Sequence, residues 1–517
     1  MSLSFLSRLN WSTIKFRRHS FGRLPCLMSD AFLRRIASGA LWSYAALLGG
    51  RIIVFAGLAL AARVLSPNEF GEFAMAMTVV SFLEVVRGFG MQRALIYFGG
   101  KSGSETVWST GFSLSIGLGL ALGGGLVAAA PMISEYYGVP AVRDYVMALS
   151  LYFVIGALGL VPDVVMRNRL DFRQRFLPET AAPMARYLLA VGCALLGYGA
   201  WSLVIGQVGG MIVNMLLTFW SARWTPRLGF DARTAKQLIG FGWQMSTVDL
   251  CAALTLNADY LFVGRFLGTE NLGLYSLAFR LPDTTIVAVA FAVAQLLLPA
   301  YVRLGADPAT LRTGFLETTR YLGMVLIPAT AGLVLLAPAL VDTLFGAPWQ
   351  HAAPLVQLLA ISALLRALVF APGAVFVSAG RPSLAVFAEL VCAGVSVPLF
   401  YLAAQRDVTT VAGVQVLSVA VYGAVKIGLL RTLIHVSWLD VVRPLWASAV
   451  ATLTMSLALL MLAPAHDRLG SALYVLAGIV VGTFTYAATL WNLDRVSIVR
   501  VSALLRSQRA EVASAGT

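Results

Sequence analysis

The chain has 517 residues, of which 59% are hydrophobic and only 12% charged, and its mean hydropathy is +0.81. An ordinary soluble protein carries about 25% charged residues, so this composition excludes a soluble globular protein. The net charge of +14 does not indicate nucleic-acid binding, because cytoplasmic arginines facing anionic lipid headgroups give membrane proteins the same excess. We therefore predict an all-α polytopic membrane protein, since the strands of a membrane barrel would alternate in polarity.

The chain begins with a basic leader at residues 1–37. It has no apolar core long enough for a secretory signal, and we expect a flexible cytoplasmic segment without a function of its own. Met28 directly precedes a stretch that looks like a protein start. Residues 1–27 are then an upstream extension if translation begins at Met28 rather than at Met1.

Apolar segments of membrane-spanning length follow one another from the leader almost to the end of the chain. We predict about fourteen transmembrane helices, at 39–62, 73–98, 107–130, 144–165, 177–197, 200–222, 238–264, 272–300, 317–341, 353–379, 383–404, 409–430, 442–463 and 471–491. Segments five and six are joined by Gly197-Tyr-Gly-Ala200 alone, so we expect a tight hairpin there. No predicted loop is long enough for a separate folded domain.

One stretch of the chain occurs twice. Residues 63–76 align without a gap on residues 265–278, each just beyond an apolar helix. The alignment pairs Arg63 with Arg265, Leu65 with Leu267, Gly71 with Gly273 and Phe73 with Tyr275. A shared arginine, glycine and aromatic residue in one register predicts two homologous halves. The turn between helices seven and eight is expected at Gly264 and Gly268.

Basic residues are distributed unevenly between the predicted loops. With the amino terminus in the cytoplasm, most loop Lys and Arg fall on the cytoplasmic side, with rich groups at 167–175 and 223–236. The opposite side then holds only Arg63, Arg143, Arg265, Arg406 and Arg468. This asymmetry predicts an even number of spans with both termini in the cytoplasm.

Charged residues also occur inside the apolar segments. The bases are Arg51, Arg87, Arg93, Arg186, Arg280, Arg366 and Lys426, and the acids are Glu84, Asp249, Asp259, Asp283 and Glu389. Each charge near the bilayer centre costs about 2.5–3.5 kcal/mol on insertion scales. We therefore expect most of them to face a wet internal cavity or to pair with one another.

Cysteine and histidine patterns predict neither disulfides nor a metal site. The cysteines are scattered, and no two histidines have the spacing of metal ligands; they are Cys26, Cys193, Cys251, Cys392, His19, His351, His435 and His466. We expect free thiols in packed helices, no metal and no cofactor.

Several motifs resemble one transporter family. Residues 62–73, ARVLSPNEFGEF, are similar to the first-loop signature of Wzx-type polysaccharide flippases, which export lipopolysaccharide or exopolysaccharide repeat units and belong to the multidrug/oligosaccharidyl-lipid/polysaccharide exporter superfamily. Residues 259–268 with 272–280 resemble its helix seven-to-eight signature, and 166–173 and 199–206 also resemble this family. The resemblance covers roughly residues 30–490, nearly the whole chain, and excludes the leader.

The resemblance implies two six-helix lobes in a V around a central cavity, followed by two further helices. The expected divisions are the leader (1–37), the N-lobe of helices 1–6 (38–222), a cytoplasmic linker (223–237), the C-lobe of helices 7–12 (238–432), helices 13 and 14 (433–492) and a cytoplasmic tail (493–517). The implied substrate is an oligosaccharide on undecaprenyl pyrophosphate, moved across the bacterial inner membrane. Membrane lipid, a polysaccharide polymerase and a chain-length regulator are the expected partners, and nucleic acid is not.

A pyrophosphate cannot cross hydrocarbon unaided, because burying a bare ion is very costly. Arginines offer planar groups that match phosphate oxygens. The candidate substrate-binding cations are Arg51, Arg87, Arg280 and Arg366, with Arg93, Lys426 and Arg186 as weaker candidates. The alternative for two of these cations is a structural ion pair three residues apart on one helix face, Glu84 with Arg87 or Arg280 with Asp283.

The acids within the segments are candidates for binding a coupling proton or sodium ion, because desolvation favours the protonated form of a buried carboxylate. The candidates are Asp249, Asp259, Glu84 and Glu389, and the alternative for each is a nearby arginine as partner. The repeat aligns Arg280 with Thr78 and Asp259 with Gly57, so the charged lining is expected to differ between the lobes.

Three other functions remain open. A multidrug or lipid-II type exporter of the same fold would share the repeat and the cavity, although a cationic drug favours a more acidic cavity. A membrane glycan polymerase or ligase usually needs a large outer loop, and none is predicted. A structural membrane protein would leave the buried charges without a purpose. The sequence therefore favours a flippase for an anionic glycolipid.

Overall fold

The computed structural model describes residues 49–495, apart from residues 52, 89, 100–103, 170–171 and 305–306. Within this part, every regular element is a helix or helical turn, which confirms the all-α fold. Nine stretches in the described ranges are long and apolar enough to cross a membrane. This confirms a polytopic membrane protein, whereas the count of fourteen spans stays a prediction. The predicted leader and most of the predicted tail lie outside the described residues.

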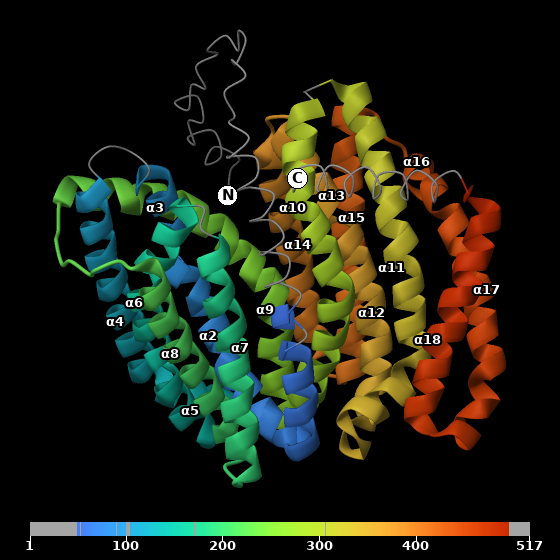
Figure 1. The fold of residues 1–517 in the computed structure, drawn as a ribbon, viewed down its shortest axis with the longest axis horizontal. Coiled ribbons are helices and arrows are strands. Elements are labelled where there is room, and N and C mark those ends of the chain that lie inside the picture. The colour runs from blue at the N-terminus through green and yellow to red at the C-terminus, as the bar shows by residue number, and fades with distance from the viewer. Residues whose placement is uncertain are drawn as a thin grey trace, which may run out of the picture.

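The first bundle comprises the helix at residues 49–64 and seven further helices (Figure 1). They are α2 (Pro67–Gly88), α3 (Met91–Gly99), α4 (Ser104–Tyr137), α5 (Ala141–Leu149), α6 (Leu151–Asn168), α7 (Phe172–Leu195) and α8 (Trp201–Ala222). The helices α2 and α7 are not among the nine candidate spans. Both carry charged residues along their length, which lowers their hydropathy and matters for the site.

One long helix joins the two sides of the molecule. This helix, α9 (Ala232–Pro282), has a single non-helical residue, Gly268, with φ 81° and ψ −175°. It packs against α2, α3 and α4 of the first bundle and also contacts helices of the second bundle. The turn predicted between helices seven and eight therefore lies at Gly268, while Gly264 stays helical and packs against Tyr137.

The second bundle stands on the other side of α9 (Figure 1). It consists of the π-turn η3 (Asp283–Val287), α10 (Ala288–Leu304), α11 (Pro308–Phe345), the 3-10 turn η4 (Ala347–Ala352), α12 (Ala353–Leu368), α13 (Phe370–Ser378), α14 (Pro382–Ala403) and α15 (Val408–Ile434). The short helix α16 (Trp438–Val442), η5 (Arg443–Leu445), α17 (Trp446–Leu462), η6 (Ala463–Ala465) and α18 (His466–Leu493) follow. The pair α17 and α18 packs on α11, and its outward side chains include Phe484 at 75% exposure, as expected of a lipid-facing surface.

Several predicted segments are interrupted in the structure. The segment 144–165 divides into α5 and α6 next to Ser150. The segment 73–98 was predicted as one helix but forms α2 and α3, because Gly90 has a φ of 55° that ends the regular helix. The segment 353–379 divides into α12 and α13 next to Val369. The segment 272–300 contains the π-turn that follows Pro282; proline lacks the N–H group that a regular helix needs at that position.

The helix α2 begins six residues earlier than predicted because the sequence caps it there. Ser66 and Glu69 form a reciprocal capping pair, in which the Ser66 N–H donates to Glu69 Oε2 (2.7 Å) and the Glu69 N–H donates to Ser66 Oγ (3.4 Å). Pro67 occupies the first helical position, where its missing N–H costs nothing. The first repeat motif is thereby held at the start of α2.

The two repeat motifs contact each other, and we call residues 63–76 and 265–278 the repeat interface. A Cβ atom at Gly71 would collide with the carbonyl oxygen of Thr269, and one at Gly273 would collide with that of Pro67. The two aligned glycines thus occupy matching places on the two sides of this contact. Only glycine lets the two backbones approach so closely.

The aligned arginines of the repeat interface reach across to the other half of the chain. Arg63 donates from Nε to the carbonyl oxygen of Leu344 (3.1 Å) and also to that of Thr343, at the carboxyl end of α11. Arg265 lies over the ring of Tyr136, 5.4 Å from its centroid, at the carboxyl end of α4. Cations at helix carboxyl ends are favourable, so each half stabilises a helix end of the other.

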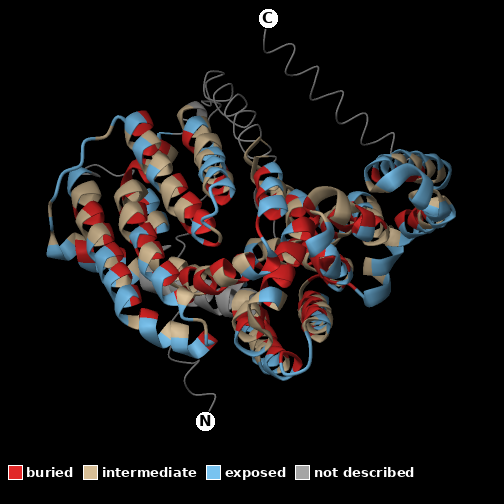
Figure 2. Ribbon diagram, turned by 90° about the horizontal axis from the view of Figure 1, so that it is seen from below, coloured by how far each residue is buried: buried red, intermediate tan, exposed pale blue. Residues whose placement is uncertain are grey.

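The largest buried core continues through the repeat interface. Phe70 packs edge-on against Trp349 with ring centroids 5.1 Å apart, and Trp349 Nε1 donates to the carbonyl oxygen of Ala62 (2.7 Å). Buried residues lie between the helices and exposed ones on their outer faces (Figure 2). The two bundles are therefore packed firmly together at this level.

Candidate functional site

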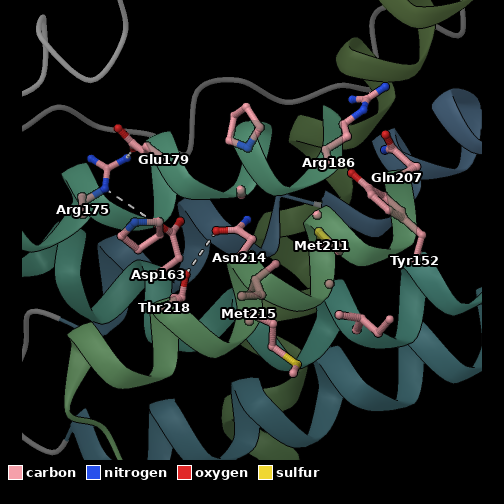
Figure 3. A pocket seen from close by; sticks show the side chains of 18 of the residues that line it. Tyr152, Asp163, Arg175, Glu179, Arg186, Gln207, Met211, Asn214, Met215 and Thr218 are labelled. Atoms are coloured by element: carbon pink, nitrogen blue, oxygen red, sulfur yellow. Dashed lines mark hydrogen bonds and ion pairs between the residues drawn. The ribbon is translucent and has the colours of Figure 1, made fainter. Parts of the chain in front are cut away.

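A polar cavity of about 410 Å³ lies inside the first bundle; we call it the first-bundle cavity (Figure 3). Its walls are α6, α7 and α8, with single residues from the helix at 49–64, from α2 and from α3. Four guanidinium groups and two carboxylates line it, namely Arg87, Arg167, Arg175, Arg186, Asp163 and Glu179. Positive groups outnumber negative ones among the lining residues.

Close packing of α7 on α8 sets one wall of this cavity. A Cβ atom at Gly210 would lie 2.7 Å from Arg186 Cβ, and one at Gly206 would lie 2.5 Å from the Arg186 carbonyl oxygen. Small residues four apart allow such close approach of membrane helices. The two helices are joined by the short turn predicted from sequence, in which Gly197 and Gly199 have positive φ angles of 83° and 53°.

The charged groups at one end of the cavity pair with one another (Figure 3). Arg167 Nε lies 2.7 Å from Asp163 Oδ2, and Arg175 Nε lies 3.8 Å from Asp163 Oδ1. Arg175 also pairs through Nη2 with Glu179. Asp163 therefore stands between two guanidinium groups.

Arg87 is held from three sides. Its Nη2 lies 3.0 Å from Glu84 Oε1, its guanidinium lies 5.3 Å from the ring centroid of Tyr152, and the Tyr152 hydroxyl donates to Glu84 Oε1 (2.8 Å). The guanidinium occupies space that a Cβ atom at Gly156 would fill. The alternative ion pair expected from the Glu84–Arg87 spacing is formed, and Arg87 nevertheless lines the cavity.

Three buried polar atoms of this lining have no hydrogen-bond partner among the described residues: Arg87 Nε, Arg175 Nε and Gln207 Oε1. Two are donors on cations, and the third is an amide acceptor. Leaving a buried polar atom unpaired costs about 1–3 kcal/mol. The two guanidinium groups and the amide group that carry these atoms line the same cavity.

A second cavity, of about 230 Å³, lies between the bundles; we call it the inter-bundle cavity. The first bundle contributes residues from α2, α7, α8 and the helix at 49–64, and the other wall comes from α9 and η3. Phe70, Phe73 and Ser276 of the repeat interface line it. The contact between the two repeat motifs thus forms part of the cavity wall.

Arg186 and Arg280 face the inter-bundle cavity from opposite walls, and Arg186 lines the first-bundle cavity as well. Neither guanidinium forms an ion pair within the described part of the chain; Arg186 lies 5.3 Å from the ring centroid of Tyr187. The third charged lining residue, Asp283, is neutralised by Arg366, whose Nη2 lies 2.8 Å from Asp283 Oδ1. The alternative Arg280–Asp283 pair expected from spacing is therefore not formed.

Arg366 lies behind Asp283, with its guanidinium 4.8 Å from the ring centroid of Phe279. It is not one of the residues that line either cavity. Arg51 lies on the helix at 49–64 and, within the described ranges, forms no ion pair and lines neither cavity. Arg93 is exposed on α3.

The remaining predicted residues lie in the second half of the chain. Lys426 is buried on α15, 4.0 Å from Glu389 Oε1 and 4.0 Å from the ring centroid of Tyr422, whose hydroxyl donates to Glu389. Asp259 is fully buried and accepts hydrogen bonds from the Tyr275 hydroxyl (2.7 Å) and the Tyr260 N–H (2.9 Å). The side chain of Asp249 lies outside the described residues.

Sequence reasoning missed most of the first-bundle cavity. Arg167 and Arg175 were attributed to a cytoplasmic loop, but their helices turn them into the cavity. A signal was present on the following helix, where Gln207, Asn214 and Thr218 recur at helical spacing within an apolar segment. All three line the cavity, and the Thr218 hydroxyl donates to Asn214 Oδ1 (3.4 Å; Figure 3).

Comparisons with known proteins identify the family and the fold of the chain. The family described as "Polysaccharide biosynthesis protein" matches residues 60–354. The chain is 26% identical over 499 residues to the succinoglycan biosynthesis transport protein ExoT of Rhizobium meliloti, covering 92% of this chain and 96% of that protein. It is 26% identical over 362 residues to the teichuronic acid biosynthesis protein TuaB of Bacillus subtilis, covering 68% and 73% of the two chains.

Two solved structures show the same fold at low sequence identity. The lipid II flippase MurJ in an inward closed conformation superposes with a TM-score of 0.72 and 14% identity, covering 89% of this chain and 100% of that one. An inward-facing multidrug resistance MATE family transporter superposes with a TM-score of 0.57 and 16% identity, covering 78% and 98%. The resemblance predicted from the sequence motifs is thereby confirmed.

Proposed function

The chain belongs to the polysaccharide biosynthesis protein family, and on this premise we propose that it is a flippase for lipid-linked oligosaccharide repeat units. It is a transporter rather than an enzyme. The cargo is an oligosaccharide on undecaprenyl pyrophosphate, and the membrane is the bacterial inner membrane. Two relatives named for succinoglycan transport and teichuronic acid biosynthesis support this class of cargo.

One observation carries the proposal: Arg186 and Arg280 face one cavity from opposite walls, and neither has a carboxylate partner within the described ranges. Two cations left unpaired in a membrane protein are costly. They become favourable when an anion binds between them, and a guanidinium matches phosphate oxygens in bidentate geometry. A pyrophosphate head held here would be shielded from the hydrocarbon of the bilayer, while the polyprenyl tail stays in the bilayer.

Movement of the head requires the two bundles to separate on one side and close on the other. We propose that the repeat interface closes the passage on the periplasmic side, with both termini in the cytoplasm. This assignment rests on the uneven distribution of loop cations, which places Arg63 and Arg265 opposite the cytoplasm. The N-lobe at 38–222 and the C-lobe at 238–432 are then the moving units.

The other predicted cations are expected to contribute less to substrate binding, and to different degrees. Arg87 and Arg366 are partly neutralised by Glu84 and Asp283, so they supply less field at the passage than Arg186 and Arg280. Roles in substrate binding for Arg51, Arg93 and Lys426 remain predictions. Lys426 is the least favoured, because Glu389 and Tyr422 surround it.

Energy coupling is a separate element of the proposal. Asp259 is the favoured coupling carboxylate because its described partners are neutral donors rather than cations; Asp249, Glu84 and Glu389 remain candidates. An anionic head also moves outward down the membrane potential, gaining about 2.3 kcal/mol per charge per 100 mV. A polysaccharide polymerase and a chain-length regulator are the proposed partners.

The test is transport of a fluorescent lipid-linked oligosaccharide into the inner leaflet of sealed vesicles that contain the purified protein. Arg186→Gln and Arg280→Gln should each slow transport at least tenfold, because each removes one charge from the head site. Arg431→Gln is the matched control, since Arg431 is exposed in the last turn of α15. Transport by both cavity variants at the rate of this control would overturn the proposal.

A further inference from the structure

We propose that the first-bundle cavity binds an acidic sugar of the cargo, through guanidinium donors for its oxyanion and an amide acceptor for a hydroxyl group. This inference rests on the proposed flippase function and adds a second binding site beside the inter-bundle cavity. It names a substrate class: repeat units that carry a uronate or a similarly acidic sugar.

The oxyanion donors are the guanidinium groups of Arg87 and Arg175, which line the cavity and whose buried Nε atoms have no hydrogen-bond partner among the described residues. Each guanidinium is already oriented through its terminal nitrogen, Arg87 by Glu84 and Arg175 by Glu179. The 3.8 Å from Arg175 Nε to Asp163 Oδ1 exceeds hydrogen-bond length. Oriented but incompletely bonded guanidiniums suit an incoming carboxylate.

Gln207 decides the nature of the rest of the ligand. Gln207 lines the cavity, and its buried Oε1 atom has no donor among the described residues, so the amide oxygen suits a ligand that donates a hydrogen bond. A fully ionised pyrophosphate offers only acceptors. A sugar hydroxyl donates, and Asn214 and Thr218 extend the polar face of α8 about two and three turns further on. The lining therefore fits an acid that also carries hydroxyl groups.

Size and position agree with a sugar of the same cargo. Ligand pockets commonly have volumes of roughly 300–1,000 Å³, and about 410 Å³ suits one or two sugar rings. Arg186 lines this cavity and also the inter-bundle cavity. A sugar held in the first bundle would therefore lie next to a pyrophosphate head held at Arg186 and Arg280.

The first experiment measures binding to the purified full-length protein in detergent, as ligand-dependent thermal stabilisation. The probes are sodium glucuronate, glucose and inorganic pyrophosphate. Glucuronate carries an acidic group together with hydroxyl groups, glucose carries hydroxyl groups alone, and pyrophosphate carries acidic groups alone. Glucuronate should bind most tightly of the three. Gln207→Leu should weaken glucuronate binding about tenfold, because the sugar hydroxyl loses its acceptor. Gln415→Leu, at a buried glutamine of α15 outside the cavity, should leave it unchanged.

Equal binding of glucuronate and glucose, or glucuronate binding that Gln207→Leu does not change, would overturn the inference. Tighter binding of pyrophosphate than of glucuronate would also overturn it, in favour of a phosphate site. A second experiment separates this failure from that of the flippase. Vesicles are given lipid-linked oligosaccharides with a neutral or an acidic sugar, and Gln207→Leu should slow only the acidic one. Equal transport of both by the variant contradicts the acidic-sugar site alone, whereas no transport of either by the natural sequence contradicts the flippase.

Discussion

The two bundles share a repeated backbone motif but treat their internal charges differently. In the first bundle, Arg87 and Arg175 line a cavity, and the Nε atom of each has no hydrogen-bond partner among the described residues. In the second bundle, Lys426 is surrounded by Glu389 and Tyr422, and Arg366 neutralises Asp283. The repeat therefore conserves what builds the contact between the halves, while the chemistry of binding lies in positions that differ between the copies.

Aligned positions make this difference concrete. Thr78 and Arg280 occupy equivalent places in the repeat, and both line the inter-bundle cavity, but only one is charged. Gly57 and Asp259 are also equivalent: a Cβ atom at Gly57 would collide with the ring of Tyr187, whereas Asp259 bonds Tyr275. An anionic ligand between the bundles therefore meets an asymmetric wall.

The largest effect is expected where the copies agree. Gly273→Ala places a Cβ atom against the Pro67 carbonyl, and because backbone cannot move aside cheaply, it should destabilise the fold by about 3 kcal/mol. The measurement is the thermal unfolding midpoint in detergent. Gly428→Ala is the control, since nothing lies within 4 Å of a Cβ atom there. Equal midpoints for the two variants would contradict the packing described for the repeat interface.

The next effect tests whether second-bundle charges are structural. Lys426→Met leaves the half-buried Glu389 without its cation and should cost about 2 kcal/mol, less than the cost for a fully buried pair. Adding Glu389→Gln should restore most of the loss. Arg280→Gln, without an ion pair among described residues, should change stability by no more than about 0.5 kcal/mol. Chemical denaturation measures both effects. Equal losses of stability in Lys426→Met and Arg280→Gln would contradict the structural role of the second-bundle charges.

A smaller effect is expected within the first-bundle cavity. Gly156→Ala fills the space of the Arg87 guanidinium and should displace it from Glu84, at a cost of about 1 kcal/mol. Binding of glucuronate should weaken in the same variant. Gly124→Ala, with nothing within 4 Å of its added Cβ atom, is the control. If Gly156→Ala binds glucuronate as tightly as the natural sequence does, Arg87 does not contribute to the proposed sugar site.

The smallest effect on stability is expected from a helix cap that is present in the α14–α15 hairpin and absent from the α7–α8 hairpin. In the α14–α15 hairpin, Asp407 caps α15 and accepts from the Thr410 N–H (2.8 Å) and hydroxyl (2.6 Å). In the α7–α8 hairpin, the N-cap residue of α8 is Ala200, which provides no side-chain cap. These bonds lower the pKa of the Asp407 carboxyl below its ordinary value. Asp407→Ala should cost about 0.5 kcal/mol at neutral pH.

The pH dependence of this last effect has a definite sign. A carboxyl group with a lowered pKa stabilises the fold fully above its ordinary pKa and loses that contribution as the pH falls through the folded value. The unfolding midpoints of the natural sequence and of Asp407→Ala should therefore converge in acid. If the difference between the two unfolding midpoints grows as the pH falls, the ionised Asp407 carboxylate is not the stabilising form of the cap.

Sequence alone predicted the features that repeat or that depend on local pattern. The apolar segments, the Gly197–Ala200 hairpin and the duplicated motif all follow from neighbouring residues. The pairing of Asp283 with Arg366 joins residues 83 positions apart, so the local spacing that favoured Arg280 was misleading. The break at Gly90 was missed because apolar residues resume beyond Gln92 and Arg93. Arg175 was taken for a loop residue because charge indicates a membrane boundary but not the direction in which a helix turns its side chains.

The repeat interface closes chiefly through glycine Cα atoms and backbone carbonyl groups. Its two aligned cations, Arg63 and Arg265, keep their protons at any physiological pH, and the bonds of Arg63 end on carbonyl oxygens rather than on a carboxylate. The pH and the salt concentration of the periplasm follow those of the medium around the cell. If the repeat interface faces the periplasm, its contacts depend little on pH or on salt. Control over opening would then come from the cargo and from the cytoplasmic side, and the barrier to small ions would persist while the medium changes.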